Sequence, residues 1–427
     1  MTAQHSAIRR MWSRDGGSLW RHRDFLIFWS GESASMLGSA VSYIAFPLVA
    51  AAVLHATAVQ MGILAMTGQL PALCFGFAVG VAADRLPLRA TMIVADLGRC
   101  LLMGWIPVAA ALGVLALWQL FAVSFGAGAL TLLFGNCYQA YLPGLIATGR
   151  LAEGNAKLAA SQSAAETGGP GVAGAIAAVG GVPSALIADA LSYLVSALAL
   201  GVLPGRSPRR AGDGERRRIW PDIKAGIQLV WQDPVLRWAT ASTAVVATFC
   251  QLQTAVYFLF MTSGLHLRVS LIGLVFTVAG AIGFVSATLA DRIAVRAGIG
   301  RLIVAGQLIE ALGGILLALA GGSHWAAAAF IVASETSYSV GAPLFVVGFT
   351  SVRQARAPER DRGKVIGASR FLSAALMPVA SLLGGVLGSV AGLRTALAVG
   401  AAGMVIGACM LWRRDILGLS AGPDLGL

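Results

Sequence analysis

The sequence Gly80-Val-Ala-Ala-Asp84-Arg85-Leu-Pro-Leu-Arg89 carries three charged residues, and their spacing recurs about half a chain later. The second copy is Ala287-Thr-Leu-Ala-Asp291-Arg292-Ile-Ala-Val-Arg296. Both copies lie between two long apolar runs, in a chain of which only 12% of the residues are charged. The recurrence predicts two related halves, each with a tight polar turn between two membrane helices.

Composition places the chain among integral membrane proteins. It is 57% hydrophobic with a mean hydropathy of +0.78, against roughly 45–50% apolar residues in soluble domains. A spanning helix needs about 20 mostly apolar residues, because its backbone must satisfy its own hydrogen bonds in hydrocarbon. Twelve segments qualify, which predicts an all-α integral membrane protein with twelve transmembrane helices in two six-helix pseudo-repeats. The segments are Phe25–Leu54, Ala58–Ala82, Ala90–Leu112, Val114–Tyr138, Leu158–Ala178, Pro183–Leu203, Leu236–Met261, Ser270–Ala290, Leu302–Gly321, Trp325–Phe349, Val365–Val390 and Leu393–Leu411.

The net charge of +12 could suggest a nucleic-acid partner, but the distribution of the basic residues argues against one. If the N-terminus is cytoplasmic, most of the 31 Lys and Arg fall in cytoplasmic segments. The outer loops then keep only Arg268 and Arg394. The positive-inside rule therefore predicts that both termini are cytoplasmic and that the partner of the basic segments is the lipid bilayer.

The apolar pattern also divides the chain into five parts. Within the linker, Ile219, Ile223, Ile227 and Val230 recur at helical spacing, which predicts an amphipathic helix on the inner membrane surface. A site for a regulatory partner is the alternative for this helix. The parts are a cytoplasmic N-terminal segment (1–24), a first six-helix bundle (25–203), a cytoplasmic linker (204–235), a second six-helix bundle (236–413) and a cytoplasmic tail (414–427).

Taken together, the twelve spans and the repeated motif resemble the major facilitator superfamily. The pattern Gly-x-x-x-Asp-Arg-x-x-x-Arg follows the second span, and a weaker copy follows the eighth. Several segments are similar to the bacterial exporter branch that includes macrolide-efflux proteins and the enterobactin exporter. They are Trp29-Ser-Gly31, Ala95-Asp96-Leu97-Gly98-Arg99, Gly169-Pro170-Gly171-Val172-Ala173-Gly174, Asp189-Ala190-Leu191-Ser192-Tyr193 and Arg362-Gly363-Lys364-Val365.

The resemblance implies a role for the repeated motif. In the family this cluster holds the inner side closed in the outward-facing state and breaks when the protein opens inward. The alternative is that the residues only fix the turn and the topology. The residues of this predicted latch are Gly80, Asp84, Arg85, Arg89, Asp291, Arg292 and Arg296.

Gly169, Pro170 and Gly174 in the fifth span resemble the family's antiporter motif, with Ala173 in place of one glycine. Small residues allow helices to approach closely, and proline bends a span. In the family this element packs the two halves together and prevents uncoupled leak. Ordinary small-residue packing is the alternative.

Ionisable side chains inside spans are costly, so each suggests a function. The resemblance implies that the first and tenth spans line a central cavity, which makes Glu32 and Glu335 the candidates for proton coupling. Low-dielectric surroundings disfavour the charged form of a carboxylate, so such a group can bind and release a proton as the cavity alternates. Neutralisation of either glutamate by a basic residue is the alternative. A buried charge network is expected from Asp96, Arg99, Asp189 and Arg370.

The substrate is expected in the same cavity, where apolar and aromatic side chains with few charges suit an amphiphilic organic molecule. The sequence thus predicts a proton-coupled antiporter that exports a drug, antibiotic or siderophore-like compound across the bacterial cytoplasmic membrane. It is expected to act as a monomer, without cofactor or metal and without enzymatic activity. The cavity candidates are Gln69, Gln251, Gln253, Tyr257 and Tyr338.

Other function classes fit less well. An ATP-driven pump would need a phosphate-binding Gly-x-x-x-x-Gly-Lys-Ser/Thr loop, which the chain lacks. The five histidines are scattered without metal spacing, which argues against a metalloenzyme. An importer of a small metabolite, a lysophospholipid transporter and a transport-inactive membrane sensor remain the alternatives.

The latch interpretation predicts that Asp84→Asn abolishes transport while membrane insertion is preserved, because the amide cannot hold the charged contacts of the turn. Substrate efflux and the amount of protein in the membrane fraction would be measured together. Unimpaired efflux by the variant would leave the motif with only a topological role.

Overall fold

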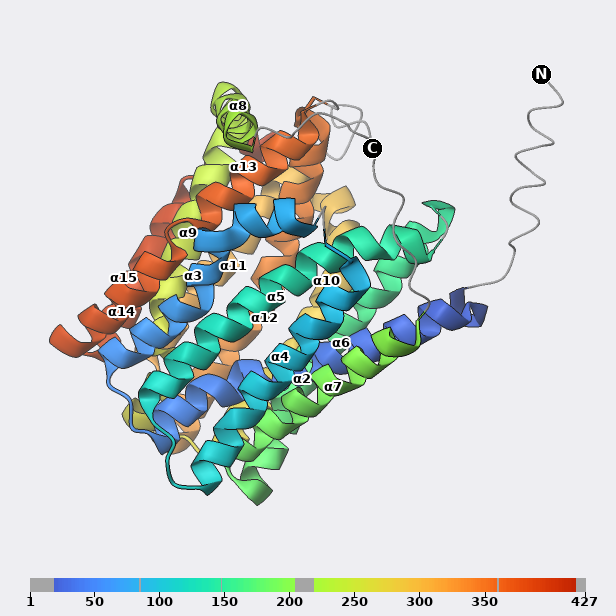
Figure 1. Ribbon diagram of the computed structural model, residues 1–427. Coiled ribbons are helices and arrows are strands. Elements are labelled where there is room, and N and C mark those ends of the chain that lie inside the picture. The colour runs from blue at the N-terminus through green and yellow to red at the C-terminus, as the bar shows by residue number, and fades with distance from the viewer. Residues whose placement is uncertain (1–18, 84–85, 147, 204–218, 359–360, 420–427) are drawn as a thin grey trace.

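The computed structural model describes residues 19–83, 86–146, 148–203, 219–358 and 361–419, and these residues contain helices and connecting links but no β-strand. Long helices run up and down in two bundles, as Figure 1 shows. The predicted all-α membrane fold is therefore confirmed.

Six long helical segments form the first half. The first of them is extended by η2 (Val49–Val53), a single turn of π-helix. Short 3₁₀ turns η1 (Leu19–Arg21), η3 (Thr148–Arg150) and η4 (Val182–Ser184) lie at helix ends. The helices are α2 (Arg23–Leu48), α3 (Ala58–Ala83), α4 (Leu88–Ala111), α5 (Leu117–Leu145), α6 (Leu151–Gly180) and α7 (Ala185–Val202).

The second half follows the same plan after α8 (Ile219–Gln232), which packs against α13 and α9. Its first helix also ends in a π-helical turn, η5 (Phe260–Gly264). The helices are α9 (Pro234–Leu259), α10 (Val269–Ala297), α11 (Ile299–Leu319), α12 (His324–Arg356), α13 (Arg362–Ala374), α14 (Met377–Val390), α15 (Leu393–Cys409) and the short α16 (Arg414–Leu417).

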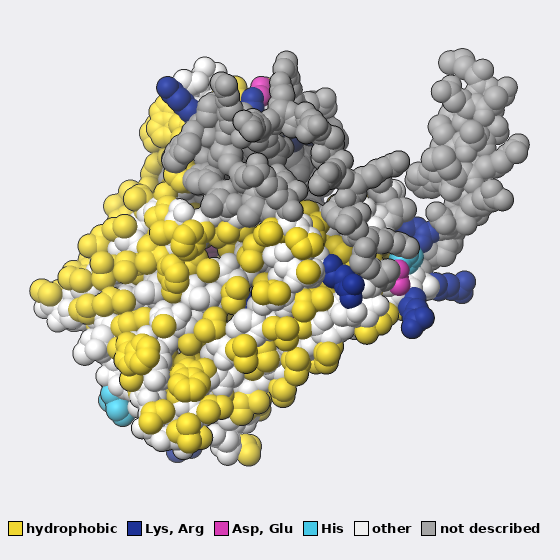
Figure 2. Space-filling model, viewed as in Figure 1, with side chains coloured by type: hydrophobic (Ala, Val, Ile, Leu, Met, Phe, Trp, Pro, Cys, Tyr) yellow, Lys and Arg dark blue, Asp and Glu magenta, His cyan; other side chains and the backbone are white. Residues whose placement is uncertain are grey.

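Ten helical segments of the described chain are long and apolar enough to cross a membrane. The remaining two predicted spans correspond to α6, whose first half is polar, and to α15, which has only 17 residues. Hydrophobic side chains cover the flank of the bundle in Figure 2, and most Lys and Arg side chains in that view lie towards its ends. This distribution is typical of a protein surrounded by lipid.

Several helices are longer than the predicted spans. The fifth span was expected to begin at Leu158, but α6 begins at Leu151, and the tenth was expected to end at Phe349, but α12 continues to Arg356. Hydropathy falls where polar residues begin, whereas backbone hydrogen bonding continues beyond the apolar run. Hydropathy therefore marks the lipid-embedded part of a helix and misses its polar ends.

One local prediction was wrong. The second copy of the motif was expected in a turn, but α10 continues through it to Ala297, and the chain turns at Gly298, where φ is +88°. The eleventh predicted span lies within one apolar segment, Arg362–Val390, whose helical hydrogen bonding is interrupted between Ala374 and Met377. Pro378 stands in the first turn of α14, where its missing N–H costs nothing.

The first helix of the second half begins two residues before the predicted bundle boundary at 236. Pro234 is the first residue of α9, and the Asp233 carboxylate accepts hydrogen bonds from the backbone N–H groups of Val235 at 2.8 Å and Leu236 at 3.0 Å. The same side chain accepts from Arg356 Nη1 at 3.0 Å. Asp233 therefore caps α9 and ties it to the end of α12.

The halves meet through two glycine crossings. Gly62 of α3 lies against Gly385 of α14, and a Cβ placed on Gly62 would lie 3.0 Å from the Cα of Gly385. In the same way, a Cβ on Gly174 of α6 would lie 3.2 Å from the Cα of Gly273 in α10. Backbones can approach this closely only where side chains are absent, so these positions allow the two bundles to pack directly.

Both crossings lie towards one end of the bundle, which we call the distal end and define by η2, η4 and η5. There η2 packs against η5, so the first helices of the two halves also touch. His55 and His266 follow these turns with φ of 50° and 51°, and no other non-glycine residue of the described chain has a positive φ. The repeat predicted from sequence thus extends to the backbone conformation of its links.

The crossings predict a large difference between two equivalent substitutions. Gly174→Leu should destabilise the protein by about 1–3 kcal/mol, because the added side chain has no room at the crossing. Gly135→Leu is the matched control, since a Cβ there meets nothing within 4 Å. Thermal unfolding in detergent should show a lower midpoint for Gly174→Leu alone. Equal midpoints would mean that the crossing is not closely packed.

Candidate functional site

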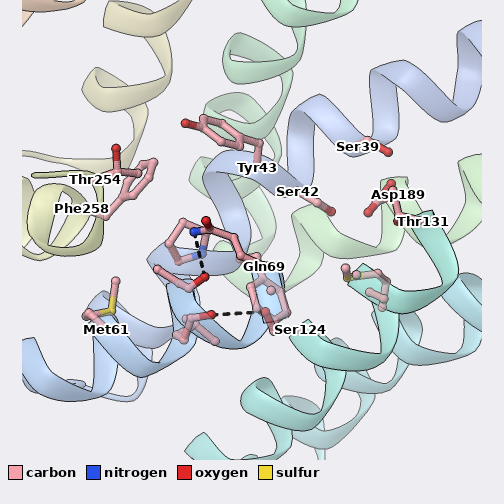
Figure 3. Close-up of a pocket in the computed structure, with 18 of the residues that line it drawn as sticks. Ser39, Ser42, Tyr43, Met61, Gln69, Ser124, Thr131, Asp189, Thr254 and Phe258 are labelled. Atoms are coloured by element: carbon pink, nitrogen blue, oxygen red, sulfur yellow. Dashed lines mark hydrogen bonds between the residues drawn. The ribbon is translucent and has the colours of Figure 1, made fainter. Parts of the chain in front are cut away.

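A cavity of about 420 Å³ lies between the two halves. Most of its wall comes from α2, α3, α5 and α7 of the first half, and α9 supplies the wall from the second half (Figure 3). Its size falls within the roughly 300–1,000 Å³ of small-molecule sites. The described residues therefore provide a site of suitable size at the boundary that the halves share.

The lining is mostly apolar and aromatic, with several hydroxyl and amide groups. Gln69 and Gln251, both expected there, are among the lining residues. Tyr257, also expected there, is not among them, but the next residue in the chain, Phe258, lines the cavity. The other polar and aromatic lining residues are Ser39, Ser42, Tyr43, Phe46, Ser124, Thr131, Asp189, Tyr193 and Thr254.

One hydroxyl connects the two lining glutamines. Ser381 Oγ of α14 accepts a hydrogen bond from Gln69 Nε2 at 3.2 Å and from Gln251 Nε2 at 3.1 Å. Gln69 belongs to the first half, and the other two residues belong to the second. Ser381 also donates to the Met377 carbonyl oxygen at 3.0 Å, which fixes the direction of its lone pairs. The cavity wall thus contains a polar link between the halves.

Two other predicted cavity residues have a different place. Gln253 is 1% exposed, and its Nε2 donates to the carbonyl oxygens of Leu397 at 2.6 Å and Gly314 at 3.2 Å. Tyr338 OH donates to Gln253 Oε1 at 2.7 Å. Because these bonds join α9, α11, α12 and α15, the pair holds the second half together. Their expected place in the cavity wall is therefore wrong.

Glu335 of α12 also lies outside the cavity lining. Its Oε1 accepts a hydrogen bond from Tyr257 OH at 2.7 Å. Tyr43 of α2, which does line the cavity, is close enough to interact electrostatically with Glu335. The carboxylate therefore belongs to the second half and lies within electrostatic range of a residue of the first.

A cluster of charges is buried within the first half. Arg99 and Asp96, both expected in a buried charge network, form an ion pair on α4. The guanidinium lies 4.4 Å from the centre of the Phe134 ring and 4.3 Å from that of Tyr193, in cation–π geometry. Arg99 is also within electrostatic range of Asp189. Both aspartates are fully buried and Arg99 is 4% exposed.

Glu32 belongs to this cluster and not to the cavity wall. It interacts electrostatically with Asp96 and Arg99, and its Oε2 is buried without a hydrogen-bond partner among the described residues. Arg370, expected in the same network, is exposed on α13 of the other half. The helix break before α14 leaves it in a separate segment, where it lies near Arg353.

The predicted latch is described only in part. Arg89 Nε donates to the Leu200 carbonyl oxygen at 2.6 Å, and its Nη2 donates to that of Gly201. These bonds tie α4 to the last turn of α7, where helix carbonyls lack partners. Gly80 lies in α3, and Arg296 is exposed in the last turn of α10. Asp291 and Arg292 also lie in α10, but their side chains are outside the described part. Asp84 and Arg85 lie outside the described residues.

The antiporter-like motif lies at a crossing between the halves. A Cβ on Gly169 would meet the Ala40 backbone carbonyl carbon of α2 at 3.0 Å. One helical turn further, Gly174 packs on Gly273 of α10, and the carbonyl oxygen of Pro170 lies beside the same glycine. The motif therefore packs α6 against α2 of its own half at Gly169 and against α10 of the other half at Pro170 and Gly174.

Sequence reasoning missed the hydroxyl and aromatic residues that α2 contributes to the cavity. Ser39, Ser42 and Tyr43 lie three and four residues apart, the spacing of one helix face. These residues were not expected in the cavity because they lie within a run that is otherwise mostly apolar, in which the charged Glu32 is the stronger signal. A search for polar residues at helical spacing inside apolar spans would have found it.

Comparison with known proteins gives the family. The family model described as Major Facilitator Superfamily matches residues 28–381. An uncharacterized MFS-type transporter of Bacillus subtilis strain 168, YfiS, is 24% identical over 295 residues, which is 69% of this chain and 68% of that protein.

Solved structures match the fold. A bacterial homologue of the iron transporter ferroportin, in its inward-facing state, gives a TM-score of 0.73 at 16% identity and covers 92% of this chain and 98% of its own. The outward-facing state of the same homologue gives a TM-score of 0.55 at 17% identity and covers 91% of this chain and 98% of its own. A mutant of the nucleoside transporter NupG gives a TM-score of 0.75 at 11% identity and covers 91% of this chain and 98% of its own.

These findings leave the resemblance to the macrolide and enterobactin exporters as a prediction. The family itself follows from the extent of the match, which takes in most of both halves. The chain belongs to the Major Facilitator Superfamily and is a multi-pass membrane protein of the transporter type.

Proposed function

We propose that this protein is a proton-coupled antiporter that exports an amphiphilic organic small molecule across the bacterial cytoplasmic membrane by alternating access. The observation that carries the proposal is the mostly apolar cavity between the two halves, whose backbones meet at the glycine crossings of the distal end. A site shared by two bundles can change its accessible side when the bundles rock against each other.

The orientation rests on the distribution of basic residues. With both termini cytoplasmic, the distal end is the outer end, and the crossings close the outer side. The conformer described here is then inward-facing. The higher TM-score against the inward-facing state of the ferroportin homologue, 0.73 against 0.55, supports this assignment.

Glu335 is the proposed proton carrier. A membrane-embedded carboxylate is costly and needs a reason to be present. Its hydrogen bond to Tyr257 lies within the second half, whereas Tyr43 belongs to the first. Rocking of the halves would move Tyr43 relative to Glu335 and change the electrostatic surroundings of the carboxylate. Protonation and conformation are then linked, as antiport requires.

Export is proposed because the antiporter-like segment of α6 forms a crossing between the halves. Close packing of Gly174 on Gly273 leaves no aqueous path between α6 and α10, which limits leak of protons past the cargo. The protein is proposed to work as a single chain, with its substrate and protons as its small partners.

Everted membrane vesicles test the proposal. Vesicles that contain the protein are energised, siderophores, macrolides and lipophilic cations are added, and a pH-sensitive dye follows the gradient. A substrate of the exporter should collapse the gradient. Glu335→Gln should lose this response, because an amide cannot take up and release a proton as a carboxylate does. Asp415→Asn, at an exposed site on α16, is the matched control and should respond like the original protein.

Two results would contradict the proposal. Gradient-driven export that persists in Glu335→Gln would remove this residue from the coupling mechanism. A folded, inserted protein that collapses the gradient with no member of the panel would favour uptake or lipid transport over proton-coupled export.

A further inference from the structure

Asp189 of α7 is a lining residue of the cavity and is fully buried. Its Oδ2 makes no hydrogen bond that meets strict geometry among the described residues, and its Oδ1 accepts a long one of 3.5 Å from Ser192 Oγ, while the hydroxyl groups of Ser42 and Tyr193 lie close to the carboxylate. Ser42 of α2 is 6% exposed, and its hydroxyl also lacks a partner within the described chain. Figure 3 shows the oxygen atoms of Ser42 and Asp189 directed towards each other.

The charges around Asp189 do not balance. Arg99 is the basic residue of the cluster, and it forms its ion pair with Asp96 while the rings of Phe134 and Tyr193 hold its guanidinium. The ion pairs that join described side chains do not include Asp189. A buried carboxylate without an ion-pair partner of its own is unfavourable, so a positive group from outside the chain would stabilise this site.

The rest of the wall indicates what that positive group is attached to. Tyr43, Phe46 and Phe258 give aromatic surface to the same cavity, and Ser39 and Thr131 supply hydroxyl groups. Aromatic rings attract cations and also bury apolar carbon. The cavity therefore matches a molecule with one cationic end and an apolar body.

A divalent metal ion matches it less well. Such ions take six or more oxygen ligands, or several His and Cys side chains. The described residues contain no group of three or more His, Cys, Asp or Glu side chains that could hold one. An ammonium group needs fewer partners, because three N–H donors can be shared between one carboxylate and neighbouring hydroxyls.

We infer that Asp189 and Ser42 form the ammonium subsite of the cavity and that the substrate is an amphiphilic organic amine in its protonated form. The inference rests on the proposed transport function and names its substrate class. The Asp189 carboxylate accepts from the ammonium group, the Ser42 hydroxyl completes its hydrogen bonds, and the aromatic wall contacts the apolar body. Neutral analogues of the same shape lose the charged contact.

A pair of matched ligands tests the inference with purified protein in detergent. The fluorescent primary amine dansylcadaverine and its neutral N-acetyl derivative are titrated, and fluorescence polarisation reports binding. The amine should bind about tenfold tighter or more, because a hydrogen bond between charged groups contributes that much. Asp189→Asn should abolish the preference, and Ser42→Ala should reduce it. Glu310→Gln, a carboxylate of α11 outside the cavity lining, is the control and should keep it.

The outcomes separate this inference from the proposed function. Binding in detergent needs no proton gradient, so an Asp189-dependent amine preference without gradient-driven transport would support the subsite and count against coupled export. Equal affinities of the original protein for the two ligands would overturn the inference without any variant. Competition by Mn²⁺ with no amine preference would overturn it in favour of a metal substrate. If Asp189→Asn fails to fold, an undiminished preference in Ser42→Ala would still contradict the proposed pair.

Discussion

Direct backbone packing at the two glycine crossings is the constraint on which the rest of the structure depends. Apolar side chains gain little from leaving lipid for a helix interface, so association of spans requires close contact. Gly62 with Gly385 and Gly174 with Gly273 provide that contact at the distal end. Where the halves are not held by glycine, larger side chains such as Tyr43 and Phe258 separate them and line the cavity. The crossings and the cavity are therefore two consequences of one distribution of residue sizes.

The two halves share a backbone plan but differ in chemistry. The first half buries the Asp96–Arg99 ion pair between aromatic rings. The second half contains a neutral network, in which Ser242 Oγ donates to Gln307 and to the Gly407 carbonyl oxygen. It also carries two carboxylates inside its spans, Glu310 of α11 and Glu335 of α12. The two halves therefore differ in the charged side chains that they place inside the membrane.

The sequence predicted the fold well because membrane insertion, charge distribution and repetition are local properties of the chain. The apolar spans and the division into two related halves both follow from composition and spacing. The site was harder to predict, because the side that a residue of a buried helix faces depends on all its neighbours. Gln253 and Gln251 are two residues apart on α9, yet one holds the second half together and the other lines the cavity. Hydropathy could not distinguish them.

Alternating access requires that the two halves rock about the cavity and open the distal end in the other state. Spin labels at Thr57→Cys and Arg268→Cys, exposed positions before α3 and α10, report the distance between the halves at that end. The measurement is double electron–electron resonance on transport-competent protein in proteoliposomes, with the native cysteines replaced. Rocking halves should give one short distance without substrate and gradient, and a second, longer population when both are present. A single unchanged distance during active transport would contradict this motion.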